Sequence, residues 1–210
     1  MRLQIKICGM RNRENIIDVA SLKPDYMGFI FYPPSPRYVA TSIDFPSDAL
    51  NSICKVGVFV NELEAVVLEK VRMFGLNAVQ LHGNESPAVC ERYKLLGLKV
   101  LKAVSVAVPD DFLLAKDYEG CVDLMVLDTK SADHGGSGRK FDWKLLKHYD
   151  AEIPFLLSGG INPADAGEIR KIKHPQLAGV DLNSRFEIEA GMKDVKRLGE
   201  FLLQLELHPE

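Results

Sequence analysis

The chain has no long apolar segment and only four cysteines in 210 residues. A membrane-spanning helix needs about 20 consecutive apolar residues, and no such run is present. Arg2 is followed directly by strand-like sequence, so we expect no signal peptide. The cysteines lie far apart, without the spacing of metal ligands, which is typical of reduced thiols in a cytoplasmic protein. We therefore expect a cytoplasmic protein without a bound metal.

An excess of charge of either sign is also missing, because 26 Lys and Arg residues stand against 29 Asp and Glu residues, a net charge of −3. This balance does not indicate a broad nucleic-acid surface, and an anionic ligand must be bound locally. We expect neither nucleic acid nor a membrane as a partner. The hydrophobic fraction of 47% is ordinary for one globular domain with a sizeable core.

Short apolar runs recur about every 20 to 30 residues and are rich in Val, Ile, Leu and Phe, like strands that are buried on both faces. These runs are QIKIC (4–8), MGFIFY (27–32), KVGVFV (55–60), AVQL (78–81), KVLKAV (99–104), LMVLD (124–128), PFLLS (154–158) and AGVDL (178–182). Four segments between or after them have helical periodicity, namely 61–75, 85–97, 161–173 and 193–205. Asn61, Ser86 and Asn162 are the expected N-caps of the first three.

This alternation of strands and helices predicts an α/β fold, a single (β/α)8 TIM barrel over residues 1–210. The alternative is an open, doubly wound sheet. The first turn of that fold often reads GxGxxG, whereas the first turn here reads CGMRNREN (8–15). The sequence shows no linker or low-complexity segment that would divide the barrel into domains.

The first strand of this barrel carries two reactive side chains on its inner face. Alternate side chains of a barrel strand point inward, so QIKIC places Lys6 and Cys8 inside and its two isoleucines outside. Apolar packing does not explain an inward Lys and Cys. A cation beside the thiol favours the thiolate and lowers the pKa of Cys8 from its reference of about 8.5. The alternative is that Cys8 is a small buried hydrophobe.

The same alternation places Asp128 at the inner rim, at the end of LMVLD. A thiol and a carboxyl group that face a common pocket can move protons on a small molecule. The alternative for Asp128 is an N-cap or a salt bridge to Lys130.

Glycine-rich and polar turns follow the seventh and eighth strands, at SGG (158–160) and DLNSRFE (181–187). Turns at these two places in a TIM barrel commonly bind phosphate through backbone amides. We therefore expect Gly159, Gly160, Asn183 and Ser184 to form a phosphate site. Plain turns are the alternative.

Three further segments lie at the expected rim. Arg37 lies in PPSPRY, a proline-stiffened loop, and its guanidinium is suited to pair with a carboxylate in bidentate fashion. His82 follows AVQL and contacts the ligand or fixes its loop. The GGSG segment (135–138), which includes Gly136, is a flexible lid or a simple connector. Together with Lys6, we expect Arg37, His82 and Gly136 to contact the substrate.

These residues lie in motifs that resemble the phosphoribosylanthranilate isomerase family over nearly the whole chain. The matching segments are KICGM (6–10), GFIFYPPSPRYV (28–39), VGVFVN (56–61), VQLHG (79–83), LDTK (127–130), GGSG with FDW (135–143) and LSGG (157–160). The chain departs from the common family form DVSSGVE at DLNSRFE, where Asn183 replaces Ser and Arg185 replaces Gly.

The resemblance implies a TIM barrel without cofactor or metal that catalyses an Amadori rearrangement in tryptophan biosynthesis. The substrate would be N-(5-phosphoribosyl)anthranilate and the product 1-(2-carboxyphenylamino)-1-deoxyribulose 5-phosphate. Carried over by position, Asp128 is the general acid and Cys8 the general base. Arg37 would bind the anthranilate carboxylate, and the turns after strands seven and eight would bind the phosphate. Asp128 must hold a proton near neutral pH, which a poorly solvated site favours.

Two other functions remain open at the level of the sequence. Lys6 and Lys102 are both expected inside the barrel, where a desolvated lysine forms a Schiff base with a sugar phosphate in an aldolase. The second alternative is a phosphosugar-binding module that has lost catalysis, and the altered NSR turn (183–185) is its best support. The sequence leaves a monomer and a homodimer equally open.

Overall fold

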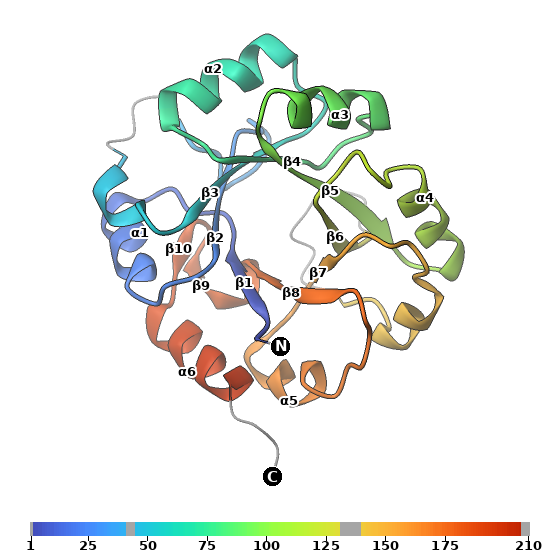
Figure 1. Cartoon of the computed structure of the whole chain (residues 1–210). Coiled ribbons are helices and arrows are strands. Elements are labelled where there is room, and N and C mark those ends of the chain that lie inside the picture. Colours follow the sequence, from blue (N-terminus) through green and yellow to red (C-terminus); the bar gives the residue numbers. More distant parts are fainter. Residues whose placement is uncertain (1, 41–44, 131–139, 207–210) are drawn as a thin grey trace.

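Eight parallel strands form a closed barrel in the computed structural model, which describes residues 2–40, 45–130 and 140–206. The strands are β1 (Gln4–Ile7), β2 (Tyr26–Ile30), β3 (Cys54–Phe59), β4 (Ala78–Leu81), β5 (Lys99–Val106), β6 (Leu124–Thr129), β7 (Phe155–Leu157) and β8 (Leu177–Leu182). Each strand pairs with the next, and β1 closes the ring against β8, with Gln4 opposite Gly179 and Ile7 opposite Leu182. The ring of strands lies inside a ring of helices (Figure 1). The predicted TIM barrel and its eight strands are confirmed.

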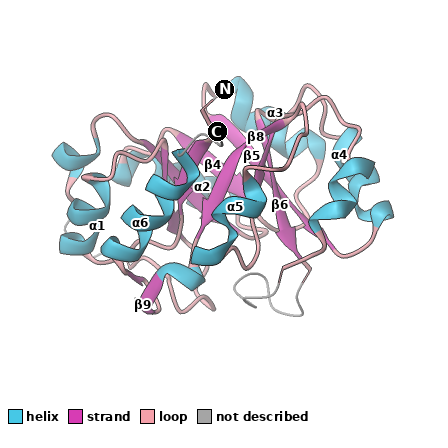
Figure 2. Ribbon diagram, turned by 90° about the horizontal axis from the view of Figure 1, so that it is seen from below, coloured by secondary structure: helices cyan, strands magenta, loops and turns pink. Residues whose placement is uncertain are grey.

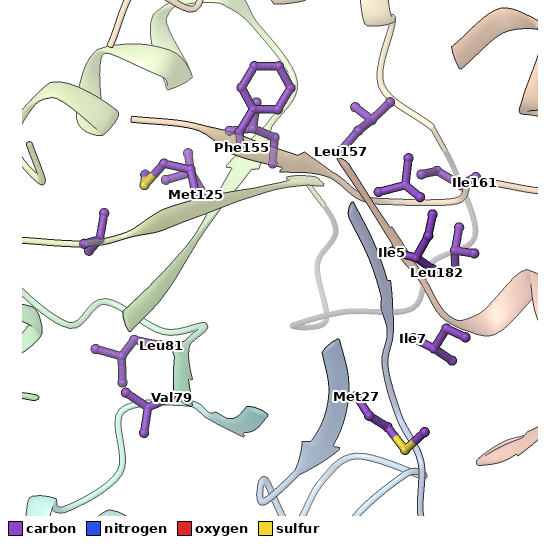
Figure 3. Close-up of a cluster of buried hydrophobic side chains, with 14 of the residues drawn as sticks. Ile5, Ile7, Met27, Val79, Leu81, Met125, Phe155, Leu157, Ile161 and Leu182 are labelled. Atoms are coloured by element: carbon purple, nitrogen blue, oxygen red, sulfur yellow. The ribbon is translucent and has the colours of Figure 1, made fainter. Parts of the chain in front are cut away.

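Apolar side chains divide into two layers according to strand alternation. Outward residues such as Ile5 and Ile7 of β1 and Leu182 of β8 join one large cluster with the helices (Figure 3). A smaller cluster fills the barrel itself and is built from strand residues alone. Its buried members are Tyr26, Val56, Ala78, Leu101, Ala103, Leu124, Val126 and Leu156. The predicted alternation in β1 and β6 is therefore confirmed.

The α-helices that surround the barrel are α1 (Arg13–Ala20), α2 (Glu64–Phe74), α3 (Pro87–Leu95), α4 (Leu113–Lys116), α5 (Ala166–Ile169) and α6 (Val195–Glu206). Short 3₁₀ helices complete the connections at Ser47–Leu50, Pro109–Phe112, Trp143–His148, Pro163–Asp165 and Ser184–Phe186. Within the described residues, no helix combines the length and apolar character needed to cross a membrane.

Two of the helix predictions needed correction. Asn61 does not cap α2, whose N-cap is Leu63; the Asn61 side chain instead accepts a hydrogen bond from the backbone of Asn84 at 2.7 Å. The segment expected as one helix over 161–173 begins correctly, with the Asn162 side chain capping a 3₁₀ turn, but α5 ends at Ile169. The predicted position of Ser86 as N-cap of α3 is correct, with Pro87 at the first helical residue.

An additional hairpin follows β8. It consists of β9 (Glu187–Glu189) and β10 (Met192–Lys193), which pair antiparallel with Lys193 opposite Glu187. Figure 2 shows β9 projecting beyond the barrel strands at one end of the molecule. The hairpin directly follows the turn that contains Asn183 and Ser184, so it lies on the same rim as the carboxyl end of β8.

Candidate active site

Cys8 lies directly after β1 and is only 4% exposed. Its backbone amide donates a hydrogen bond to the Leu182 carbonyl at 2.9 Å, which continues the pairing of β1 with β8. A Cβ atom added to Gly28 of β2 would lie 2.6 Å from the Cys8 sulfur. Gly28 therefore leaves the space that the thiol occupies, a role that the sequence analysis did not find.

Lys6 is completely buried behind Cys8 and pairs with Asp181 of β8 at 2.9 Å. Burial opposes the charge of Lys6, but Asp181 and Cys8 together raise the pKa of its ammonium group. The expected lowering of the Cys8 pKa is wrong in its net direction. Burial raises the pKa of the thiol by more than Lys6 lowers it, and the charge of Asp181 raises it further.

Asp181 is a site residue that the sequence analysis missed. One of its carboxylate oxygens accepts from Lys6, and the other, Oδ1, is buried without a hydrogen-bond partner among the described residues. A buried oxygen of this kind is costly and calls for an explanation. Its position on the inner face of β8 was the available signal, because a carboxylate there cannot be an apolar packing residue.

Asp128 lies at the inner rim of β6, with 14% of its side chain exposed. The Thr129 amide donates to its Oδ1 at 2.8 Å, and the Nε2 atom of His82 is 3.4 Å from its Oδ2. The other nitrogen of His82 is 2.9 Å from the side-chain amide nitrogen of Gln80, which lies on the same inner face of β4 as Ala78. Lys130, the alternative partner of Asp128, pairs with Asp111 instead at 3.2 Å. The structure thus brings His82 and Asp128 together.

The turn after β7 packs closely against Asp128. Gly159 and Gly160 have φ values of 80° and 67°, in the left-handed region that favours glycine. A Cβ atom on Gly159 would lie 2.5 Å from the Thr129 nitrogen and 2.8 Å from Oδ1 of Asp128. Glycine is therefore required at this position for the turn to reach the carboxyl group.

The turn after β8 carries Asn183 and Ser184 at the start of a short 3₁₀ helix. The Asn183 side chain points back toward β1, because its Oδ1 is 2.6 Å from the position of a Cβ on Gly9. The same oxygen accepts a hydrogen bond from Lys193 at 2.7 Å.

The Arg37 guanidinium is bound to a carboxylate of its own chain. Its Nε and Nη2 atoms donate to the two oxygens of Glu187 at 2.9 and 2.7 Å, and only 12% of the Arg37 side chain is exposed. Burial alone would raise the pKa of the Glu187 carboxyl, but Arg37 and Lys193 together lower it. Arg37 thus pairs in bidentate fashion with Glu187, a partner that the sequence analysis did not predict.

One other predicted residue, Lys102, is not part of this arrangement. Lys102 does not face the interior as expected, because its neighbours Leu101 and Ala103 do. Its ammonium group lies outside the barrel, where it donates to the Gly83 carbonyl at 2.7 Å and approaches Glu85 at 3.4 Å. Gly136 lies outside the described residues. Among those residues, we find no cluster of three or more His, Cys, Asp or Glu side chains that would hold a metal ion.

The fold and the polar side chains at the carboxyl ends of β1, β4, β6 and β8 are those of a TIM-barrel enzyme. Comparison with known proteins gives the family. Residues 5–204 match the family model of N-(5'-phosphoribosyl)anthranilate (PRA) isomerase. The chain therefore belongs to the N-(5'-phosphoribosyl)anthranilate isomerase family.

Individual relatives agree with this assignment. The chain is 46% identical to the N-(5'-phosphoribosyl)anthranilate isomerase of Parabacteroides distasonis, over 98% of this chain and 94% of the relative. It is 42% identical to that of Phocaeicola vulgatus, over 96% and 97% of the two chains. The crystal structure of the Thermotoga maritima enzyme superposes with a TM-score of 0.82 at 33% identity, covering 97% of this chain and 98% of that one.

Proposed function

We propose that this protein converts N-(5'-phosphoribosyl)anthranilate to 1-(2-carboxyphenylamino)-1-deoxyribulose 5-phosphate in tryptophan biosynthesis. The observation that carries this proposal is the placement of Cys8 and Asp128 at the inner, carboxyl ends of two strands of one closed barrel. A related isomerase structure, 30% identical with a TM-score of 0.78 over 97% of this chain and 98% of that one, contains the reduced form of this product. That complex supports the same ligand class here.

The reaction requires two proton movements, and the two residues take one each. Asp128 protonates the ribose ring oxygen as the bond from that oxygen to carbon 1 breaks, which gives a Schiff base. Cys8 then removes the proton from carbon 2, and the electron pair of the broken C–H bond forms the double bond between carbons 1 and 2 of an enolamine. Reprotonation at carbon 1, with loss of the enol proton, gives the ketone. General acid–base steps of this kind typically contribute 10²- to 10⁴-fold to a rate.

Cys8 must therefore lose its proton during turnover, although burial raises the pKa of its thiol. The completely buried Lys6 ammonium group opposes that effect, because its positive charge stabilises the thiolate. We assign Lys6 this electrostatic role. A neutral side chain at this position would leave only the charge of Lys193 to oppose the effect of burial.

The two ends of the substrate are held by separate groups in this proposal. Arg37 binds the anthranilate carboxylate beside Glu187, and His82 contacts the substrate at the rim. Gly159, Gly160, Asn183 and Ser184 bind the phosphate. Holding both ends orients the sugar between acid and base, which supplies several kcal/mol toward the barrier.

We further propose that the protein works in the cytoplasm, as a monomer or homodimer, without cofactor, metal, nucleic acid or membrane. The cysteines support a reducing compartment, because Cys8, Cys54, Cys90 and Cys121 are all free thiols. The homodimer has support from one related structure, 31% identical with a TM-score of 0.78, that is described as a monomer generated from dimeric Thermotoga maritima phosphoribosylanthranilate isomerase.

The direct test is turnover of N-(5'-phosphoribosyl)anthranilate by the purified chain, followed as loss of substrate fluorescence. We expect saturable conversion without added metal or cofactor. A chain that binds the substrate without converting it would be a phosphosugar-binding module, and the proposal would fail. Borohydride trapping tests the aldolase alternative, which predicts a covalent adduct on a lysine; we expect none, since Lys102 lies outside the barrel and Lys6 is paired with Asp181.

A further inference from the structure

The β9–β10 hairpin carries a charged pair that is buried although it lies at the rim of the barrel. Glu187, its first residue, and Lys193, its last, are paired across the two strands. Their side chains are 4% and 0% exposed, and the Lys193 nitrogen is 2.6 Å from the Glu187 carboxylate. Burying two charges is expensive, and replacing such a pair by apolar residues is often neutral or stabilising. The pair therefore requires a reason beyond stability.

The contacts of this pair reach both groups that we assign to the ends of the substrate. Glu187 accepts two hydrogen bonds on one side from Arg37, the proposed carboxylate ligand, at 2.9 and 2.7 Å. Lys193 donates at 2.7 Å to Asn183, a proposed phosphate ligand. One buried ion pair thus connects the two binding ends through direct hydrogen bonds.

The net charge of the residues around this ion pair also favours an anionic substrate. Arg37 and Lys193 carry two positive charges against the single negative charge of Glu187, so these three residues together keep a charge of +1. The contacts with Glu187 use the Nε and Nη2 edge of Arg37, and the edge that bears Nη1 is suited to a second carboxylate. An anionic ligand at that edge neutralises the excess charge.

The body of the barrel holds the pair in place. Asn15 of α1 is buried, and its side chain accepts from the Lys193 amide at 2.7 Å and donates to the Lys193 carbonyl at 2.9 Å. The Gly191 amide donates to Glu187 at 3.1 Å. Asn15 of α1 therefore fixes the backbone of Lys193, and the hairpin backbone holds the Glu187 carboxylate, which is the rigid support that a precise binding group needs.

We propose that Glu187 and Lys193 are positioning residues that set Arg37 and Asn183 for the two anionic ends of the substrate. The inference rests on the proposed function, because it assigns a purpose to groups near that site. Glu187 fixes the plane of the Arg37 guanidinium. Lys193 holds the Asn183 side chain toward β1, so that the backbone of the β8 turn keeps one conformation. Neither residue transfers a proton.

The test compares Glu187→Gln and Lys193→Met with the wild type for kcat, KM and binding of two probes. We expect Glu187→Gln to raise KM about tenfold, with kcat changed less than about threefold, because binding is lost while acid and base remain. Calorimetry with anthranilate and with inorganic phosphate separates the two ends and needs no turnover. Glu187→Gln should weaken anthranilate more than phosphate, and Lys193→Met should weaken phosphate by at least about fivefold.

Asp25→Asn is the matched control, since it makes the same carboxylate-to-amide change at the opposite end of β1. Asp25 accepts from the Ile5 amide at 2.8 Å and lies far from the rim that carries Cys8. We expect it to lower stability without changing KM or probe binding. If Glu187→Gln does not fold, the double variant Glu187→Gln/Lys193→Met removes both charges together and should fold with weakened binding of both probes.

A folded Glu187→Gln variant with wild-type KM and wild-type affinity for anthranilate would overturn this inference. The inference would also be overturned if Asp25→Asn lost as much affinity for the two probes as Glu187→Gln does. A wild-type chain without turnover would instead reject the proposed function, and the calorimetric comparison would still decide whether the hairpin positions Arg37 and Asn183.

Discussion

Cys8 and Asp128 carry the two proton transfers of the proposed mechanism, and each is tested by a nearly isosteric change. We expect Cys8→Ser and Asp128→Asn each to lower kcat roughly 100-fold or more, because each removes a proton-transferring group and leaves its shape. Steady-state fluorescence assays measure the decrease in kcat, and circular dichroism checks that each variant is folded. Near wild-type turnover in either folded variant would remove that residue from the mechanism.

Gly28 gives a second test at the scale of a single residue. An alanine there would place its methyl group 2.6 Å from the Cys8 sulfur and 3.2 Å from the Cys8 Cα. We expect Gly28→Ala to lower kcat at least about tenfold, since the thiol must move relative to the sugar. Overpacking of this kind also costs about 1–3 kcal/mol of unfolding free energy, which denaturant titration measures.

Gly167→Ala is the control for that variant. Gly167 lies in α5, and the nearest atom to an added Cβ is 4.0 Å away. We expect unchanged kcat and a stability equal to or slightly above that of the wild type, because alanine is the better helix former. Wild-type kcat in Gly28→Ala would show that the thiol does not depend on this space.

Alternation within one strand was enough to find Lys6, Cys8 and Asp128, because each lies on the inner face of a run of only four to six residues. Lys102 was misplaced because the same test was not applied to β5, where Leu101 and Ala103 take the inner positions. The net pKa of Cys8 was beyond prediction, since complete burial and the charge of Asp181 depend on β8. The partner of Arg37 lies 150 residues away in the sequence, so only the folded chain reveals it.

At the scale of the element, the β9–β10 hairpin makes stability sensitive to acid. The folded-state pKa of Glu187 is lowered, so its ion pairs contribute stability that is present above the unfolded value of about 4.3 and is lost as pH falls through the folded value. We expect the melting temperature of the wild type to fall more between about pH 7 and about pH 3 than that of Glu187→Gln. Differential scanning fluorimetry measures both. Parallel acid curves for the two proteins would show that Glu187 contributes nothing to this effect.

The sequence predicted long, strongly periodic elements better than short ones. All eight barrel strands were found, because continuous Val, Ile, Leu and Phe runs are needed when both faces are buried. The hairpin was missed because its strands have three and two residues, too few to show alternation. The helix expected over 161–173 was too long because its start is encoded locally by Asn162 and Pro163, whereas its end depends on packing.

At the scale of the whole molecule, closure of the sheet makes every strand depend on two neighbours. β1 and β8 come from opposite ends of the chain, and their pairing completes the ring. We expect urea to unfold the protein in one transition, with coincident curves from far-UV circular dichroism and from the fluorescence of Trp143, the single tryptophan. Two separated transitions would contradict a single domain over residues 1–210.

The salt bridge between Lys6 and Asp181 restricts how the ends of the chain can come together. If β1 shifted by one residue along β8, Lys6 would face the apolar layer between the barrel and the helices. Asp181 would then remain inside the barrel without its partner. Misaligned closure therefore carries the penalty of stranded charges. When β1 and β8 pair in the correct register, the same step brings the active-site residues into place. A folded but inactive form with shifted register is therefore not stable.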